Sequence, residues 1–117
     1  MKVIIAGSRD ITDIEKVASI LTEAFIELKV EGPVEIVSGC AKGVDFIGET
    51  FANFCEYDLK RFPADWATHG KAAGPIRNKQ MAEYADAAIV IHNGSKGSLN
   101  MIEQMRKLNK PVFVKEV

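Results

Sequence analysis

Short apolar runs alternate with amphipathic segments along the whole chain, and this alternation constrains the fold more than any other feature. Residues 3–6, 34–37, 87–91 and 111–115 are clear strand segments, and residues 58–62 form a weaker one. The segments between them carry apolar residues at helical spacing. Buried strands that alternate with such helices predict a parallel sheet with helical crossovers. We therefore expect an α/β, Rossmann-like three-layer sandwich with five parallel strands in the order 3-2-1-4-5.

Helix-start signals mark the segments between the strands. Thr12 and Glu15 fit a capping box, in which each side chain satisfies a free amide of the other residue. Asp45 and Ser98 are placed to cap later helices, and Pro75 suits a first helical position. The residues expected to face the core are Ile14, Val17, Ala18, Leu21, Ala24, Phe25, Leu28, Ile47, Phe51, Phe54, Cys55, Met101, Ile102, Met105 and Leu108.

Length and composition fit an ordinary globular protein. The chain has 117 residues and a formal net charge of −1, which predicts one domain over residues 1–117 without a broad basic surface. Its first apolar run is too short for a signal peptide or a membrane span. Cys40 and Cys55 show neither CxxC nor metal-ligand spacing. We expect a cytoplasmic protein with two free thiols, no membrane partner, no metal ion and no cofactor.

Glycine-rich turns follow three of the expected strands. They are residues 6–10 (AGSRD), 38–45 (SGCAKGVD) and 92–98 (HNGSKGS), and all three should emerge at the same edge of the sheet. Glycine lets a ligand approach the main chain, and helix N-termini offer unpaired amides to anions. Nearby cations add to such a site; they are Arg9, Lys42, Lys71, Arg77 and Lys96. The turns predict a phosphate site, although neither a P-loop nor a GxGxxG sequence is present.

The loop over residues 63–78 is the most distinctive segment of the chain. It places Trp66 and His69 between a strand and a helix. The ring of Trp66 could stack on a base, or it could fold the loop against the sheet edge. His69 fits a catalytic base, although a hydrogen-bonding role within the loop is the simpler interpretation.

These stretches together resemble the SLOG superfamily, which is named for the Smf/DprA and Lonely Guy proteins. They are "AGSRD", "SGCAKGVD", "FPADW..HGKAAGPIRN..M" and "GSKGS.NM", and they extend from residue 3 to residue 114. Within the superfamily the chain is most similar to the small YspA-like, cpYpsA-related group. The resemblance implies a Rossmann-like fold that binds nucleotides or nucleotide-derived ligands.

The resemblance and the turns together imply a set of ligand-binding residues. They are Gly7, Ser8, Arg9, Ser38, Gly39, Ala41, Lys42, Gly43, Asp45, Asp65, Trp66, His69, Gly74, Arg77, Asn78, Gly94, Ser95, Gly97 and Ser98.

The chain departs from the family pattern at several positions. Cys40 stands where a small residue, often glycine, is usual, and Ser95 and Ser98 replace a glycine and a threonine of the last turn. Lonely Guy enzymes carry a catalytic glutamate in "GGxGTxxE", and here that position is Met101. Glu103 lies two residues further along, which turns its side chain about 200° away on a helix. The resemblance therefore does not transfer that activity directly.

Three functions fit these features. The first is a module that senses or sequesters a nucleotide-like ligand, with its base near Trp66. The second is hydrolysis of a nucleotide N-glycosidic bond, with Asp45, Asp65 and His69 as candidate catalytic groups. Asp45 fits a helix cap as well, and Asp10 is a further available acid.

The third function is binding of single-stranded DNA, as in a DNA-processing relative. The net charge of −1 argues against it, as does the lack of alternating basic and aromatic residues. We therefore expect binding of a small nucleotide-like molecule first, glycosidic chemistry second, and no nucleic-acid partner. Lonely Guy enzymes form dimers, so the resemblance also implies a homo-oligomer. The apolar face of residues 101–108 could serve that contact or pack in the core.

Overall fold

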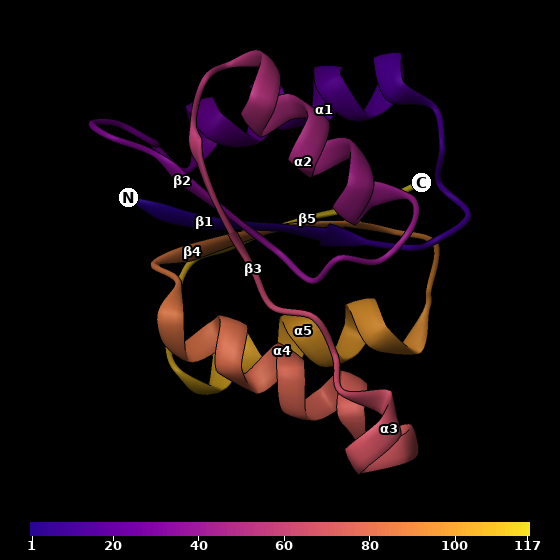
Figure 1. Ribbon diagram of the computed structural model, residues 1–117. Coiled ribbons are helices and arrows are strands. Elements are labelled where there is room, and N and C mark those ends of the chain that lie inside the picture. Colours follow the sequence, from indigo (N-terminus) through magenta and orange to yellow (C-terminus); the bar gives the residue numbers. More distant parts are fainter.

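A five-stranded parallel sheet forms the centre of the computed structural model, which describes all residues from 1 to 117 (Figure 1). Its strands are β1 (Lys2–Gly7), β2 (Glu35–Ser38), β3 (Asp58–Arg61), β4 (Ala87–His92) and β5 (Val112–Glu116). They lie in the order β3-β2-β1-β4-β5, and every neighbouring pair is parallel. The predicted α/β fold and strand order are therefore confirmed.

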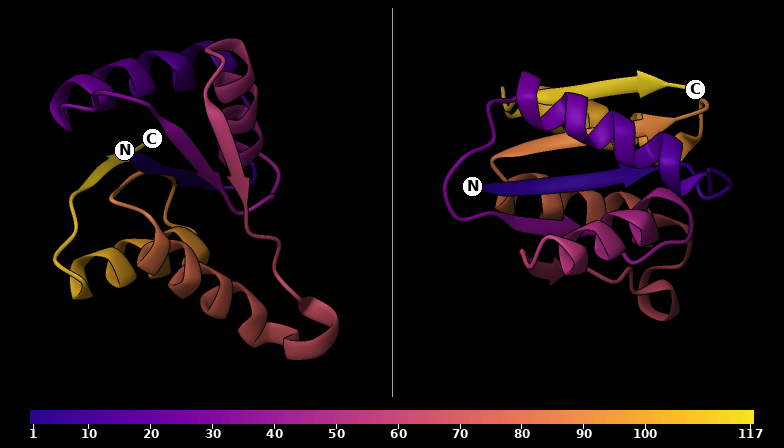
Figure 2. Two further views of the ribbon diagram at one scale, coloured as in Figure 1. Left: turned by 60° about the vertical axis from the view of Figure 1, so that its left-hand side comes forward. Right: turned by 90° about the horizontal axis from the view of Figure 1, so that it is seen from above.

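Helices cover both faces of this sheet. They are α1 (Ile14–Glu27), α2 (Val44–Phe54), α3 (Trp66–His69), α4 (Ala73–Tyr84) and α5 (Lys96–Lys107), with a 3₁₀ turn, η1 (Gly70–Ala72), between α3 and α4. Helices α1 and α2 lie on one face, and α4 and α5 lie on the other (Figures 1 and 2). The short α3 projects at the end of α4, away from the centre of the sheet (Figure 2).

Two hydrophobic clusters fill the space between the layers. Successive strand residues point to opposite faces, so Val3 and Ile5 pack beneath α1 and α2, whereas Ile4 packs against α4 and α5. Every residue of β4, which lies between β1 and β5, is buried. Burying one isoleucine side chain contributes about 1.5–3 kcal/mol, so these alternating positions determine the strand register.

The helices begin one or more residues away from the predicted caps. Asp13, not Thr12, caps α1, because its Oδ1 accepts a hydrogen bond from the Lys16 amide at 3.2 Å. Ser95 is the N-cap residue of α5, and Ser98 lies inside the helix and is buried. Asp45 lies inside α2, whose N-cap is Gly43.

The helix that contains Pro75 starts two residues earlier than predicted. Pro75 is the third residue of α4 rather than the first, because the helix already begins at Ala73. Proline is tolerated throughout the first turn, since the amide that it lacks has no intrahelical acceptor there. Pro75 therefore indicated the correct helix, but the predicted first residue lies after the observed one.

Three residues predicted to face the core are exposed. Ile14 and Phe54 are 57% and 88% exposed, and Leu108 is 43% exposed. Each stands at a helix terminus, where no neighbouring element covers the side chain. In contrast, Met101 and Met105 are almost fully buried, so the apolar face of α5 packs in the core.

The carboxyl ends of all five strands lie at one edge of the sheet, where the three glycine-rich turns emerge. The chain passes from β1 to β2 and β3 on one side and then returns to place β4 on the other side of β1. The strand order thus reverses between β1 and β4, and ligands of open α/β sheets bind outside the strands at such a point. No helix of the structure combines the length and the apolar character that crossing a bilayer requires.

Candidate functional site

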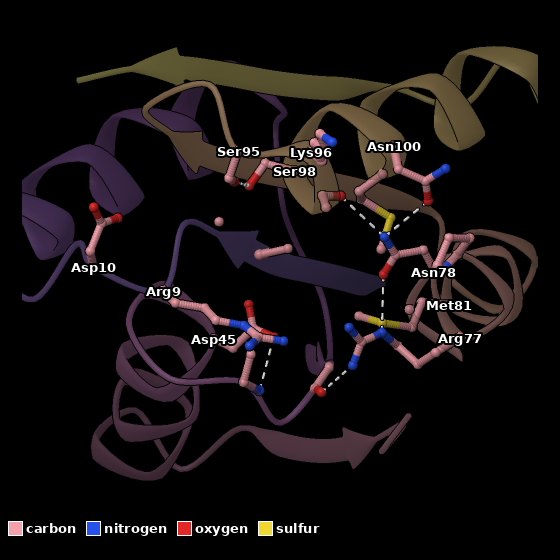
Figure 3. A pocket seen from close by; sticks show the side chains of 18 of the residues that line it. Arg9, Asp10, Asp45, Arg77, Asn78, Met81, Ser95, Lys96, Ser98 and Asn100 are labelled. Carbon is pink, nitrogen blue, oxygen red and sulfur yellow. Dashed lines mark hydrogen bonds between the residues drawn. The ribbon is translucent and has the colours of Figure 1, made fainter. Parts of the chain in front are cut away.

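A cavity of about 600 Å³ opens at this edge of the sheet, between the turns after β1 and β4 and above the first half of α4 (Figure 3). Its size is in the range of small-molecule sites. It is lined by Ala6, Gly7, Arg9, Asp10, Gly39, Ala41, Asp45, Trp66, Lys71, Gly74, Pro75, Arg77, Asn78, Met81, Asn93, Ser95, Lys96, Gly97, Ser98, Asn100 and Met101.

Most residues of the predicted ligand set line this cavity, but seven do not. The seven are Ser8, Ser38, Lys42, Gly43, Asp65, His69 and Gly94. Lys42 lines a neighbouring hollow, which shares five lining residues with the cavity: Arg9, Gly39, Ala41, Trp66 and Arg77. The prediction missed several lining residues, notably Asn93 and Asn100, because an asparagine without a partner in the sequence gives no chemical signal.

Serine hydroxyls join the turns on the two sides of the cavity. Ser8 is 1% exposed, and its Oγ lies 2.9 Å from Ser95 Oγ and accepts a hydrogen bond from the Asn93 amide at 3.1 Å. Ser95 Oγ in turn donates to Ser98 Oγ at 2.7 Å. These hydroxyls hold the turn after β1 against the start of α5. Ser8 therefore holds the two turns together, although its own side chain does not line the cavity.

A second set of contacts fixes the turn after β2. Ser38 is fully buried; its Oγ donates to Glu49 Oε2 at 2.6 Å and accepts from the Cys40 amide at 3.1 Å. Glu49 also forms an ion pair with Arg61 at 3.0 Å. Ser38 thus holds the turn together, and it does not line the cavity.

Cys40 occupies a conformation that suits glycine. Its φ is +64°, in the left-handed region that costs most L-residues about 1–2 kcal/mol. This explains why the family pattern favours a small residue, often glycine, at this position. Burial raises the pKa of the Cys40 thiol, so the thiol is less reactive than an ordinary cysteine.

Arg77 reaches across from α4 and closes the turn after β2 (Figure 3). Its Nη1 donates to the carbonyl oxygens of Gly39 and Phe62, and its Nε donates to Asn78 Oδ1 at 3.0 Å. A side chain at Gly39 would collide with this guanidinium, because a Cβ there would lie 2.8 Å from Nη1. Glycine at position 39 therefore allows the arginine to enter the wall of the cavity.

Asn78 connects α4 to α5 and holds Arg77 in place. It is 6% exposed, and its Nδ2 donates to the Gly97 carbonyl and to Asn100 Oδ1, both at 3.1 Å. Its Oδ1 accepts the bond from Arg77. Since all of these groups are paired within the protein, Asn78 positions the site.

The cavity is rich in positive charge. Four cationic side chains line it, Arg9, Lys71, Arg77 and Lys96, against the two carboxylates of Asp10 and Asp45. None of the four belongs to any of the three ion pairs of the structure. Burial lowers the pKa of Arg77, and the positive charge of Arg9 adds to this effect. Two like charges near one cavity favour an anion between them.

The N-terminus of α5 adds to this positive potential. The Ser95 side chain accepts no hydrogen bond from a backbone amide of the first turn. The amides of that turn have no intrahelical acceptor and point along the positive end of the helix dipole. Lys96, Gly97 and Ser98 of this turn line the cavity. A negatively charged group is therefore stabilised at the start of α5.

Asp45 is a buried carboxyl group in the opposite wall of the cavity. It is 5% exposed, and its Oδ2 accepts a hydrogen bond from the Ala41 amide at 3.2 Å. Burial raises the pKa of Asp45 to about 6, although the Ala41 amide and the charge of Arg77 act in the opposite direction. Asp45 therefore changes its ionisation near neutral pH, which sequence reasoning did not anticipate for a helix cap.

The segment before α4 brings only part of its predicted residues to the cavity. Trp66 is half exposed and lines the cavity, where the edge of its ring lies over Gly74. Asp65 is exposed and caps α3, with its Oδ1 accepting from the Thr68 amide at 3.1 Å. Hydrogen bonds from Thr68 hold the pKa of Asp65 below its usual value. His69 is also exposed and lies outside the lining.

The three candidate catalytic groups therefore do not converge on one point. Only Asp45 lines the cavity, whereas Asp65 and His69 are exposed at the two ends of α3. Met101, which stands at the position of the Lonely Guy glutamate, lines the cavity with an apolar side chain. Glu103 points away from it and pairs with Lys107 at 3.2 Å on the exposed side of α5. No cluster of three or more histidine, cysteine or acidic side chains is placed to bind a metal ion.

The comparison with known families agrees with the resemblance noted in the sequence. The model of the YspA, cpYpsA-related SLOG family matches residues 1–69, which span β1 to α3. This segment includes the turns after β1 and β2 and also Trp66, whereas α4 and α5 lie beyond it. No curated protein and no solved structure matches the chain. Since the match covers more than half of its residues, the chain belongs to the YspA, cpYpsA-related SLOG family.

Proposed function

We propose that the cavity at the carboxyl edge of the sheet binds a phosphorylated, nucleotide-like small molecule. One observation carries this proposal: Arg9 and Arg77 line the same cavity and form no ion pair, across from the unpaired amides at the start of α5. Guanidinium groups bind phosphate through paired hydrogen bonds, and helix N-termini stabilise the same charge. The site is best suited to a phosphate.

The two arginines contribute in different ways. Arg77 is held by two carbonyl oxygens and by Asn78, so its remaining Nη2 is a fixed donor. Arg9 is exposed and makes no hydrogen bond within the protein, so it is free to close over a ligand. A fixed donor lowers the ordering cost of binding, and a mobile one adapts to the ligand.

The rest of the cavity fits the body of a nucleotide. Trp66 supplies an aromatic surface at one end, and Met81, Pro75 and Met101 give the cavity apolar walls. A base gains about 1–3 kcal/mol from stacking on an aromatic side chain. The family also supports a nucleotide-related ligand, since SLOG membership suggests one.

Binding of small phosphates tests this proposal directly. Isothermal titration calorimetry of the wild-type protein with the four ribonucleoside 5′-monophosphates should show binding of at least one. Arg9→Ala should weaken that binding about tenfold or more, the loss expected for one charge-assisted hydrogen bond. Lys107→Ala is a matched control, because Lys107 pairs with Glu103 on the far side of α5. Unchanged affinity in Arg9→Ala would exclude the phosphate site proposed here.

Hydrolysis of an N-glycosidic bond is the second candidate function, and Asp45 is the observation that favours it. A buried carboxyl group with a raised pKa in a cavity is suited to general acid–base chemistry near neutral pH. Chromatography of each binding nucleotide after incubation would detect a released base. Release that is lost in Asp45→Asn supports an enzyme, and intact ligand supports a sensing or sequestering role.

A further inference from the structure

We propose that Asp45 recognises the ribose hydroxyl groups of the ligand, so that the cavity selects ribonucleotides over nucleotides that lack them. This inference rests on the proposed function, because it names a feature of the same ligand. It assigns the two walls of the cavity to different parts of that molecule. The phosphate lies at the start of α5, and the sugar hydroxyls lie at Asp45.

Asp45 is a hydrogen-bond acceptor that the protein itself leaves incompletely used. Its Oδ2 accepts a hydrogen bond from the amide of Ala41 at 3.2 Å, and the amide of Gly7 lies near enough to the carboxyl group to lower its pKa as well. An ionised carboxylate has about four acceptor positions on its two oxygens. No fully buried side-chain oxygen of the structure lacks a partner, so the other oxygen, Oδ1, is not closed off from solvent, and Asp45 lines the cavity. A donor from a ligand would satisfy it.

The surroundings of Asp45 favour a neutral donor over a cation or a phosphate. Asp45 belongs to none of the ion pairs. Charged or titratable groups face it from three sides, with Arg77 on α4, Arg9 on the turn after β1, and Glu49 and Cys40 on the side of α2. The arginines already supply positive charge, and the carboxylates repel a phosphate. A hydroxyl group of the ligand can donate a hydrogen bond to Asp45 and carries no charge, so it suits these surroundings.

The dimensions of the cavity place both ends of a nucleotide within reach. Asp45 and the residues that begin α5, Ser95 and Lys96, lie on opposite sides of it (Figure 3). The volume of about 600 Å³ is sufficient for a nucleoside monophosphate. The phosphate and the sugar can therefore contact their separate walls at the same time.

The pH dependence of selectivity distinguishes this role from a contact with the phosphate. An ionised Asp45 accepts hydrogen bonds from hydroxyl groups, and a protonated one is a much weaker acceptor. Because the pKa of Asp45 is about 6, selectivity for the hydroxyl groups should be high at pH 7.5 and low at pH 5. The second ionisation of a phosphate also occurs near pH 6. Its effect on affinity is the same for two ligands with the same phosphate, so it cancels in the ratio of their affinities.

The experiment compares each of the four ribonucleoside 5′-monophosphates with its 2′,3′-dideoxy counterpart by calorimetry. For a ribonucleotide that binds, the dideoxy compound should bind about tenfold or more weakly at pH 7.5, as expected for loss of a hydrogen bond to a charged acceptor. This ratio should fall towards one at pH 5. Asp45→Asn should reduce the ratio at pH 7.5 and remove its pH dependence.

Asp58→Asn is the matched control, because Asp58 is an exposed aspartate at the first residue of β3 and belongs to no ion pair. It should keep the wild-type ratio at both pH values. Equal binding of the ribonucleotide and its dideoxy counterpart, or a ratio that Asp45→Asn leaves unchanged, would overturn this inference while the phosphate site stands. If no ribonucleotide binds, the proposed function fails and this inference fails with it.

Discussion

The hydroxyl groups of Ser8 and Ser95 lie 2.9 Å apart and join two turns that are 87 residues apart in the sequence. One turn follows β1 and the other follows β4, so the contact closes the point where the strand order reverses. Both turns contribute residues to the wall of the candidate site. The turns that form the cavity are therefore joined by a contact in which Ser8 is buried and does not line the cavity.

Removing the Ser8 hydroxyl should destabilise the protein. Ser8→Ala leaves the partly buried Asn93 amide without its acceptor and removes the contact with Ser95, and loss of such hydrogen bonds costs about 1 kcal/mol each. Urea unfolding should show this loss in the free energy of unfolding. Ser19→Ala is the matched control, because Ser19 is exposed on α1 and its hydroxyl makes no hydrogen bond. Equal stability of Ser8→Ala and the wild type would mean that the turns do not depend on this contact.

The variants Arg77→Ala and Arg9→Ala should differ in their effect on stability, although both weaken binding. Arg77→Ala removes the donors to the Gly39 and Phe62 carbonyl oxygens, so it should lower the free energy of unfolding by about 1–3 kcal/mol and also weaken ligand binding. Arg9→Ala should weaken binding and leave unfolding within about 0.5 kcal/mol of the wild type, since Arg9 is exposed. Lys42→Ala should weaken binding less than Arg9→Ala, because Lys42 lines only the neighbouring hollow. A larger loss of affinity in Lys42→Ala than in Arg9→Ala would place the phosphate in that hollow.

Trp66 should contribute to ligands that carry a base. Trp66→Ala should weaken a bound ribonucleotide by about tenfold, in keeping with loss of one stacking contact, while ribose 5-phosphate binds with nearly unchanged affinity. Calorimetry with the two ligands gives the comparison. Equal losses for both would show that Trp66 shapes the loop through its contact over Gly74 and does not stack on a base.

The raised pKa of Asp45 makes stability depend on pH. Its pKa in the folded protein is about 6, against 3.8 as the ordinary value, so the folded state binds this proton more tightly than the unfolded state. The contribution of Asp45 to stability is therefore fully present below about pH 4. It decreases as pH rises through 6, by roughly 3 kcal/mol in total.

Asp45→Asn should remove this decrease, so the variant gains stability relative to the wild type between pH 4 and pH 7. Urea unfolding of both proteins at several pH values measures the difference. Parallel curves for the two proteins would show that the pKa of Asp45 is the same in the folded and unfolded states.

The conformation of Cys40 predicts a stabilising substitution. Cys40→Gly should raise the free energy of unfolding by about 0.5–1 kcal/mol, because glycine adopts a positive φ without strain. Cys55→Gly should lower it, because Cys55 has a helical φ of −86°. A loss of stability in Cys40→Gly would mean that packing of the thiol outweighs the backbone strain.

The fold could be predicted from the sequence because its signals are local and repeated. Each strand is a short apolar run, each crossover is an amphipathic helix, and the parallel order follows from that alternation. Helix starts were less certain, since Thr12 and Asp13 are neighbouring residues that both form good caps. The structure selects Asp13.

The site was predictable where it depends on turns and unpredictable where it depends on contacts between distant residues. The glycine-rich turns indicated the edge of the sheet and the arginines near it. The burial of Ser8 and Ser38 could not be read from the sequence, because their partners, Ser95 and Glu49, become neighbours only in the folded protein. The raised pKa of Asp45 has the same origin, since it results from burial between the turn and the helices.

A thermal-shift comparison of the wild-type protein and Arg9→Ala tests the central claim most directly. The ligands would be nucleoside 5′-monophosphates, cyclic nucleotides and ADP-ribose derivatives, with ribose 5-phosphate as the smallest member. A ligand that binds only the native state raises the melting temperature. We expect at least one phosphorylated compound to raise it in the wild type and to raise it much less in Arg9→Ala. If no phosphorylated compound raises it, or if the rise is the same in both proteins, the cavity is not the phosphate-binding site that we propose.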